Sequence, residues 1–283
     1  MPEARPLRDI SDTALWAAVF RARETERPDA LFQDPFARRL AGARGDYIAE
    51  TMPNAMNNSW AWVMRTYVFD ELITAQVNAG ADTVINLAAG VDARPYRMAL
   101  PASLKWYEID LPAMISYKAE ILSGEQPVCA LERIPLDLRE LDRRRELFRQ
   151  LAQQSARAVV LSEGLLIYLS DEEVGGLARD LASERSIGAW IIDLASPALR
   201  EMMRQTTGDS MDQASAPLRF SPPDGPEFFQ RHGWNATEVH SILKTAVRTK
   251  RVPPELQAFA GFPEPPKPWA AGIWSGVCLL EKA

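Results

Sequence analysis

The chain has 283 residues, 47% of them hydrophobic and 25% charged, which is the ordinary composition of a globular protein. Its formal net charge of −6 disfavours broad binding to nucleic acid or to an anionic membrane. The first ten residues are charged and contain prolines, so they do not resemble a secretory signal, and no apolar run approaches the roughly 20 residues that span a bilayer. Two cysteines, Cys129 and Cys278, have no metal-binding or disulfide spacing. We therefore expect a cytoplasmic protein without a metal and leave its oligomeric state open.

Helical patterns dominate the first 80 residues. Ser11-Asp12-Thr13 is a candidate N-cap for a helix over residues 14–26, and Asp34-Pro35 starts a second helix. A third helix is expected over residues 57–78, where large apolar side chains recur at helical spacing. Three tryptophans of this region could line an acceptor pocket, although packing in the core is favoured: Trp16, Trp60 and Trp62. Because a nucleotide-binding sheet does not need this extension, we expect it to cover a ligand site.

Apolar strands and helical patterns then alternate. Strands are expected at 83–88, 104–109, 128–134, 158–162 and 188–194, and helices near 112–122, 139–154 and 171–185. Such alternation predicts an α/β fold with a Rossmann-like, mostly parallel, doubly wound sheet.

The end of the chain is expected to complete this sheet. Residues 196–225 have loop composition, and a loop of that length is typical of a lid. A helix at 226–232, a strand at 234–239 and an antiparallel last strand at 272–280 follow. We expect one domain with a helical cap (1–80), a cofactor-binding core (81–195), the lid (196–225) and the end of the core (226–283).

The most informative stretch is Thr83–Arg94, a short apolar strand followed by the turn Ala88-Ala89-Gly90. A strand, a turn of small residues and a helix form the first half of a nucleotide-binding βαβ unit. A dinucleotide would place its pyrophosphate at this turn, but two of the three expected glycines are missing and Asp92 lies close by. S-adenosylmethionine has no phosphate, and an acid that binds its ribose hydroxyls is expected about 20 residues after the turn, where Glu108-Ile109-Asp110 lies. The stretch therefore predicts a site for S-adenosylmethionine.

Five short motifs follow one another in a specific order and spacing. They are Asp34-Pro35-Phe36-Ala37, Val63-Met64-Arg65-Thr66, Asn86–Asp92, Tyr107–Pro112 and Ser162–Tyr168. Together they resemble the leucine carboxyl methyltransferase family of class I S-adenosylmethionine-dependent methyltransferases. The resemblance runs from about Thr13 to Leu280 and is strongest to the bacterial branch that includes polyketide carboxyl O-methyltransferases of the tetracenomycin type.

This resemblance implies a cofactor-binding role for several residues. Arg65 matches the arginine that holds the carboxylate of the cofactor, for which a forked guanidinium is well suited. Gly90 and the backbone around Ala88 match the turn under the cofactor, and Asp110 matches the acid that binds the ribose. The chain departs from the family at Ala88, where the leucine-specific enzymes usually have glycine, and the extra methyl group narrows the turn.

Four more residues take their roles from the same resemblance. Asp137 and Leu138 match the pair beside the adenine, and Glu163 matches an acid near the amino group of the cofactor. Tyr168 matches a tyrosine near the reacting end and is the candidate catalytic residue. Without the resemblance, Asp110 and Asp137 are also suited to capping the helices that follow them, Arg65 to a surface ion pair and Tyr168 to the core.

The resemblance implies methyl transfer to oxygen, with a small molecule as the acceptor. A carboxylate, with a pKa near 4, is already a nucleophile at pH 7, whereas a phenol with a pKa near 10 gains from a general base. The chain has only two histidines, His232 and His240, and both lie late in the sequence. This favours a carboxylate acceptor over the alternative of a phenol or another hydroxyl.

Three other classes of protein stay open. Leu161–Gly164 is half of the nucleophile elbow of a hydrolase. Ala93 and Asp110 satisfy part of the fingerprint of an NAD-dependent oxidoreductase. A protein that binds the cofactor without catalysis is the third class.

Overall fold

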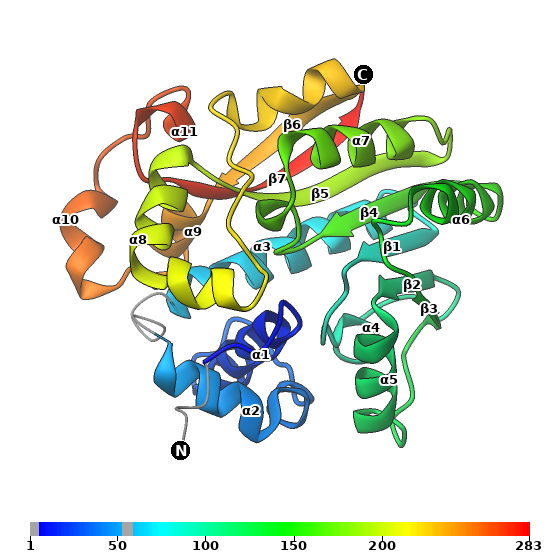
Figure 1. Cartoon of the computed structure of the whole chain (residues 1–283), viewed down its shortest axis with the longest axis horizontal. Coiled ribbons are helices and arrows are strands. Elements are labelled where there is room, and N and C mark those ends of the chain that lie inside the picture. Colours follow the sequence, from blue (N-terminus) through cyan, green and yellow to red (C-terminus); the bar gives the residue numbers. More distant parts are fainter. Residues whose placement is uncertain (1–5, 53–58) are drawn as a thin grey trace.

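The computed structural model describes residues 6–52 and 59–283, which form a seven-stranded sheet with helices on both sides (Figure 1). The strands are β1 (Thr83–Leu87), β2 (Lys105–Asp110), β3 (Ala130–Pro135), β4 (Ala158–Ser162), β5 (Ile187–Ala195), β6 (Trp234–Ser241) and β7 (Ser275–Lys282). Their order in the sheet is β3-β2-β1-β4-β5-β7-β6, and β7 is antiparallel to both of its neighbours. The expected Rossmann-like sheet with an antiparallel last strand is confirmed.

The helices connect these strands and extend the chain at its start. They are α1 (Asp12–Thr25), α2 (Ala37–Thr51), α3 (Ser59–Asn78), α4 (Arg94–Arg97), α5 (Pro112–Ile121), α6 (Leu141–Gln153), α7 (Asp171–Ala182), α8 (Pro197–Gln213), α9 (Ile242–Arg248), α10 (Gln257–Ala260) and α11 (Pro268–Ala271). Short 3₁₀ helices are η1 (Leu166–Tyr168), η2 (Gly225–His232) and η3 (Pro254–Leu256). Gly233, with a φ of 91°, ends η2 in the left-handed region.

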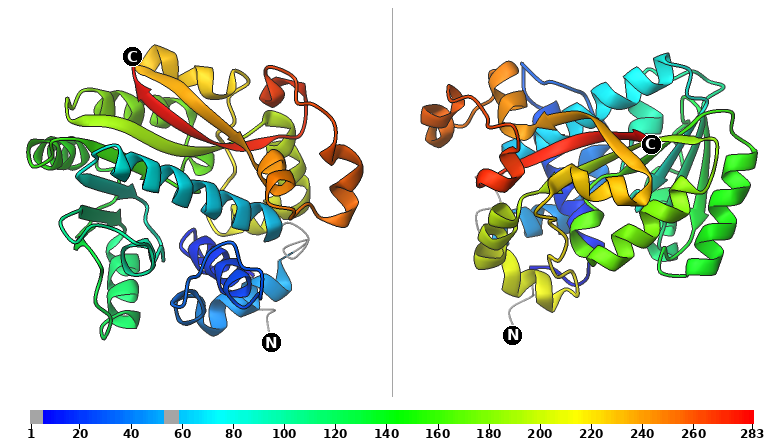
Figure 2. Two further views of the ribbon diagram at one scale, coloured as in Figure 1. Left: turned by 180° about the vertical axis from the view of Figure 1, so that it is seen from behind. Right: turned by 90° about the horizontal axis from the view of Figure 1, so that it is seen from above.

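The sheet separates two apolar cores because neighbouring residues of a strand point to opposite faces. On β1, Val84 belongs to the core formed with α3 and α9, whereas Ile85 belongs to the core formed with α6, α7 and η2. The right-hand view of Figure 2 shows these two helical layers on either side of the sheet. Neither layer covers the carboxyl ends of the parallel strands, where other elements of the chain pack.

The first two helices pack together and reach the turn that follows β1 (Figure 1). Arg44 of α2 donates to the buried carboxylate of Asp12 in α1, at 2.6 Å between Nη2 and Oδ2. Arg21 of α1 donates to the carbonyl oxygen of Val91, beyond β1, at 2.7 Å. The N-terminal helices are thus held against the ligand-binding edge of the sheet.

Three expectations for individual elements need correction. Residues 197–213 form the helix α8 rather than a loop, because the Oγ atom of Ser196 accepts a hydrogen bond from the Leu199 amide at 3.2 Å and Pro197 is compatible with the first helical turn. The helix α2 begins at Ala37 rather than at Asp34-Pro35, because residues 34–36 form a turn in which the Asp34 carboxylate accepts a hydrogen bond from the Phe36 amide at 3.2 Å. The helix α9 was not expected, and residues 57 and 58 of the expected third helix lie outside the described residues.

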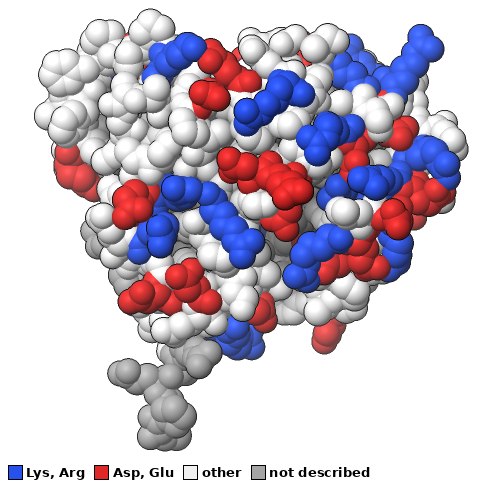
Figure 3. All heavy atoms as spheres, turned by 45° about the horizontal axis from the view of Figure 1, so that its top comes forward, with Lys and Arg blue, Asp and Glu red and all other residues white. Residues whose placement is uncertain are grey.

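The surface carries both signs of charge. On the face shown in Figure 3, acidic and basic side chains are interleaved. Within the two described ranges, no helix is both long and apolar enough to cross a membrane.

Candidate active site

A cavity of about 1340 Å³ opens at the carboxyl ends of the parallel strands. Side chains of α1, α3, α8 and the segment 255–276 complete its walls. The eight residues that the sequence singles out all line this cavity: Arg65, Ala88, Gly90, Asp110, Asp137, Leu138, Glu163 and Tyr168. Residues far apart in the chain are therefore brought together at the edge where open α/β sheets bind their ligands.

The turn after β1 is shaped by the approach of α1. Gly90 has a φ of 49°, and a Cβ atom there would lie 2.9 Å from the Cβ atom of Ala14. Ala88 also adopts the left-handed region, with a φ of 50°, which is strained for a residue with a Cβ atom. Glycine is therefore needed at position 90 because α1 packs closely against the turn.

Asp110 holds this turn through its side chain. Its Oδ2 atom accepts a hydrogen bond from the Gly90 amide at 2.6 Å, and its Oδ1 atom accepts one from the Leu111 amide at 2.7 Å. Burial raises the pKa of the Asp110 carboxyl group, although these two bonds oppose the shift. The carboxylate lines the cavity and anchors the turn, while the N-cap of α5 is Leu111.

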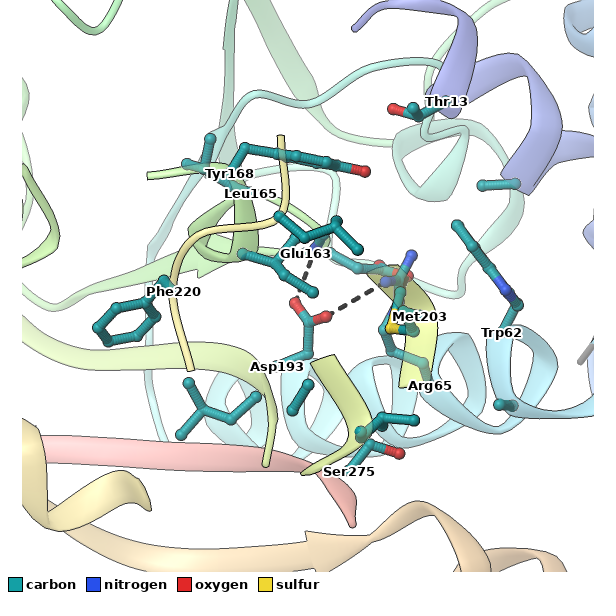
Figure 4. A pocket seen from close by; sticks show the side chains of 18 of the residues that line it. Thr13, Trp62, Arg65, Glu163, Leu165, Tyr168, Asp193, Met203, Phe220 and Ser275 are labelled. Atoms are coloured by element: carbon teal, nitrogen blue, oxygen red, sulfur yellow. Dashed lines mark hydrogen bonds and ion pairs between the residues drawn. The ribbon is translucent and has the colours of Figure 1, made fainter. Parts of the chain in front are cut away.

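Arg65 of α3 reaches across the cavity to two acids (Figure 4). Its Nε atom lies 3.1 Å from Oε1 of Glu163, and its Nη1 atom lies 3.2 Å from Oδ2 of Asp193. The other oxygen of Asp193 accepts a hydrogen bond from the Gly164 amide at 2.7 Å. The Arg65 guanidinium also lies over the ring of Trp62, 4.8 Å from its centroid.

Arg94 shares Glu163 with Arg65 and also pairs with two further acids. Its Nη1 atom lies 2.7 Å from Asp92 and 2.8 Å from Glu163, and its Nε atom lies 2.6 Å from Asp70. Burial would raise the pKa of Glu163, but Arg94 and Arg65 hold it below its ordinary value. The Glu163 carboxylate therefore stays ionised at neutral pH, as a partner for a cation must.

The sequence did not reveal Arg94 and Asp193 as members of this site. Asp193 interrupts the apolar run Trp190–Leu194 of β5, and a carboxylate in such a run is the one available signal. Burial raises the pKa of Asp193, while Arg65 opposes the shift. Arg94 follows the turn as an ordinary helix residue, so only the structure reveals its contacts.

Asp137 and Leu138 lie at the rim of the cavity after β3. The Asp137 carboxylate pairs with Arg139 at 2.6 Å and accepts a hydrogen bond from the Arg139 amide at 3.0 Å. These hydrogen bonds, led by that from the Arg139 side chain, lower the pKa of Asp137. The capping interpretation does not apply, because α6 begins only at Leu141.

Tyr168 lies at the end of η1 and faces α1. Its ring packs against the core and also lines the cavity. Burial raises the pKa of its phenol, partly offset by a hydrogen bond with Thr13, so the hydroxyl is protonated at neutral pH. Figure 4 shows Tyr168 on the same side of the cavity as Thr13 and Leu165.

The three tryptophans combine both expected settings, whereas the serine of the possible elbow is inaccessible. Trp16, Trp60 and Trp62 pack in or against the core and also line the cavity. Ser162 is fully buried, and its Oγ atom accepts a hydrogen bond from Nε1 of Trp190 at 3.0 Å. This serine is therefore not exposed as a hydrolase nucleophile would be.

Neither histidine belongs to the cavity wall. The ring of His232 lies 5.1 Å from that of Phe228, on the side of the sheet with α7 and η2. Nε2 of His240 pairs with Glu238 at 2.9 Å on the edge strand β6. The titratable groups at the centre of the cavity are thus carboxylates, arginines and Tyr168.

Comparison with known proteins gives the same assignment along most of the chain. A protein-family model for leucine carboxyl methyltransferase matches residues 14–182, a range that holds all eight predicted site residues. A Parafrankia sp. protein named as an S-adenosyl-L-methionine-dependent methyltransferase is 30% identical over 270 residues, covering 89% of this chain and 85% of that protein. A Streptomyces coelicolor protein named in the same way is 32% identical over 251 residues, covering 83% and 86%. A DUF574 family protein from Streptomyces avermitilis shares the fold, with a TM-score of 0.60 at 12% identity over 94% of this chain and 97% of that one.

Proposed function

The chain belongs to the leucine carboxyl methyltransferase family and is an S-adenosylmethionine-dependent methyltransferase, and we propose that it methylates a carboxylate of a small-molecule acceptor. When bound, the cofactor supplies an electrophilic methyl group on a sulfonium. The task of the protein is then to bind both molecules, align them and exclude water.

The donor set of the cavity fits this cofactor. We assign the ribose hydroxyls to Asp110, whose two oxygens each accept only one hydrogen bond in the described structure. The ammonium fits beside the carboxyl groups of Glu163, whose pKa is held low by Arg94 and Arg65, and Asp193. The carboxylate fits Arg65, whose Nη2 atom takes part in neither of its hydrogen bonds to these acids.

The other predicted residues take outer positions in this assignment. Asp137 and Leu138 lie where the adenine would meet the rim after β3. Tyr168, with its protonated hydroxyl, would contact the acceptor or the reacting end and contribute a hydrogen-bond donor.

The choice of a carboxylate rests on one observation, the place of the two histidines. His232 and His240 both lie outside the cavity wall, and Glu163 and Asp193 are held by arginine. A phenol would need a base to lose its proton, whereas a carboxylate arrives as a nucleophile. This supports a carboxylate as the acceptor.

Arg219 offers a positive charge for such an acceptor. It lines the cavity, and its backbone amide donates to the carbonyl oxygen of Ile167 at 2.7 Å, next to Tyr168. The other arginines of the cavity wall each form an ion pair: Arg21, Arg65, Arg94 and Arg139. Within residues 6–52 and 59–283, the Arg219 guanidinium forms none.

The test is a methyl-transfer assay with methyl-labelled S-adenosylmethionine on pairs of acids and phenols that share a carbon skeleton. We expect labelled product from the acids only, and alkaline hydrolysis should release the label as methanol because methyl esters are cleaved and methyl ethers are not. The rate with an acid should be flat above about pH 6, since the acceptor is already ionised. Base-stable product formed from the phenols, with a rate that rises toward pH 10, would reject the proposal in favour of a hydroxyl acceptor.

A further inference from the structure

Of the eight exposed large hydrophobic side chains in the described ranges, four lie around one cavity, among them the three most exposed. Within the described ranges, the three most exposed large hydrophobic residues are Ile273, Phe262 and Phe259, at 67%, 65% and 58%. All three line the cavity described above, and so does Met202 of α8, at 37%. Exposed apolar groups gathered around a cavity mark a binding surface, whereas scattered ones carry no such meaning.

We propose that these four residues form an apolar rim that binds the body of a bulky apolar acceptor, while the acid group of the acceptor enters the cofactor-binding end. This inference rests on the proposed function and names the class of its substrate: an acid with a long or wide hydrocarbon part. The rim consists of Met202, Phe259, Phe262 and Ile273.

The size of the cavity agrees with a second large ligand. Its volume of about 1340 Å³ exceeds the roughly 300–1,000 Å³ usual for a single small-molecule site. The walls between the rim and the acids are also apolar, because α8 contributes Leu199, Met203 and Met211. Met203 and Arg65 line the same cavity, and Figure 4 draws both side chains there.

The part of the rim that carries Phe259 and Phe262 is held by polar contacts from α9 and from Ser241, the last residue of β6. Nζ of Lys244 donates to the carbonyl oxygens of Ala260, at 3.3 Å, and Phe262, at 2.5 Å. Oγ of Ser241 donates to the carboxylate of Glu264 at 2.5 Å. These contacts fix the backbone that carries Phe259 and Phe262, so their exposure is built into the fold.

The test measures binding separately from methyl transfer. Straight-chain alkanoic acids of four to ten carbons are titrated by calorimetry into the protein saturated with S-adenosylhomocysteine, which cannot donate a methyl group. We expect the affinity to rise about fourfold for each added methylene, the factor expected for a buried methylene. The double variant Phe259→Ser/Phe262→Ser should bind the short acids as the native protein does and lose most of the dependence on chain length.

A matched variant controls for the loss of exposed apolar surface. Val239 and Val247 are exposed by 39% and 37% and do not line the cavity, so Val239→Ser/Val247→Ser should keep the full chain-length dependence. Binding of S-adenosylhomocysteine should be equal in all three proteins, which shows that the fold is retained.

Distinct outcomes would overturn this inference and the proposed function. The inference is wrong if affinity does not change with chain length, if the phenylalanine variant keeps the native dependence, or if a peptide with an apolar C-terminus binds more tightly than every alkanoic acid. If alkanols bind with the same chain-length dependence and are methylated while the acids are not, the rim assignment stands and the carboxylate assignment fails. If the acids are methylated but their affinity does not depend on chain length, the carboxylate assignment stands and the rim assignment fails.

Discussion

Arg65 combines two tasks that a single residue rarely has. The guanidinium assigned to the cofactor carboxylate also pairs with Glu163 and Asp193, so it lies between a site for an anion and two fixed anions. Arg94 neutralises Glu163 from the other side, which leaves Asp193 with Arg65 as its one ion-pair partner in the described structure. Arg65 therefore has two roles that can be tested separately: binding the cofactor carboxylate and pairing with Asp193.

We predict that Arg65→Lys weakens binding of S-adenosylmethionine by about 1.5–3 kcal/mol, roughly 10- to 150-fold, although the charge is kept. An ammonium cannot reproduce the two-pronged geometry of a guanidinium. Arg65→Ala should weaken it further, and adenosine, which has no carboxylate, should bind almost as it does to the native protein. Calorimetry with the two ligands measures this difference.

Asp193→Asn is the companion variant, because it removes the same ion pair and leaves the arginine in place. Asp193 is itself assigned to the cofactor ammonium, so the two variants are compared by their unfolding temperatures, which both should lower, and by adenosine binding, which neither should change. Equal losses for adenosine and S-adenosylmethionine in Arg65→Ala would make Arg65 a purely structural residue.

For single residues, the sequence predicts site residues that belong to a local motif and misses site residues whose partners lie far away in the chain. Gly90 and Asp110 were found because a strand, a small turn and a following acid form a motif within about 30 residues. The need for glycine at position 90 comes partly from Ala14, which lies 76 residues earlier in the chain, and no local pattern records that contact. Arg94 and Asp193 likewise gain their meaning only from Glu163 and Arg65.

Among the elements, α8 forms part of the cavity wall as a helix, where a loop was expected. The sequence predicted a loop at residues 196–225 because threonine, glycine and aspartate interrupt any helical apolar stripe there. The helix forms nonetheless, and it places Leu199, Met203 and Met211 on the cavity wall while its opposite side is exposed. A helix with so little buried surface has few tertiary contacts to stabilise it, so we expect bound ligands to supply part of its packing.

We predict that α8 becomes more protected when both ligands are bound. Hydrogen exchange of its amides, residues 197–213, should slow at least about tenfold with S-adenosylhomocysteine and a bound acid, because the ligand buries apolar side chains that are otherwise open to solvent. Exchange in α6, which packs on the far side of the sheet, should not change. Exchange that is equally fast in α8 with and without ligands would show that this element is a fixed wall and not a lid.

The strands and the longer connecting helices were predictable because each depends on its own residues. Every residue of β1 and β4 is buried, and short, mainly apolar runs of this kind are typical of central strands. The α7 helix begins with the capping box formed by Ser170 and Glu173, which marks its start in the sequence. The α9 helix was missed because only seven residues form it and its start signal, Ser241, terminates a strand.

At the scale of the whole molecule, buried ion pairs hold the N-terminal helices to the sheet. Asp12 is the centre of one group, since it accepts hydrogen bonds from Arg8 and from Arg44 of α2. Asp34 is the centre of another and pairs with Arg21, which also reaches Val91 beyond β1. Because the cavity lies between these helices and the sheet, the same pairs that stabilise the fold also complete the site.

This arrangement predicts a specific loss of stability in acid. Burial would raise the pKa of Asp12, but hydrogen bonds from Arg8 and Arg44 lower it from 3.8 to about 2. A depressed pKa in the folded state gives stabilisation that is complete above the unfolded pKa near 3.9 and is lost as the pH falls toward 2. At pH 7 this amounts to about 2 kcal/mol, and about half of it is gone at pH 3.

The measurement compares urea unfolding of the native protein and Asp12→Asn between pH 7 and pH 3. The variant should be less stable by about 2 kcal/mol at pH 7, and the difference should shrink steadily below pH 4, because the native carboxylate is then protonated in the unfolded chain first and in the folded protein later. Asp209→Asn, at an exposed position of α8, should follow the native protein throughout. A difference between Asp12→Asn and the native protein that stays constant down to pH 3 would mean that Asp12 stabilises the N-terminal helices through its shape and hydrogen bonds, and not through its charge.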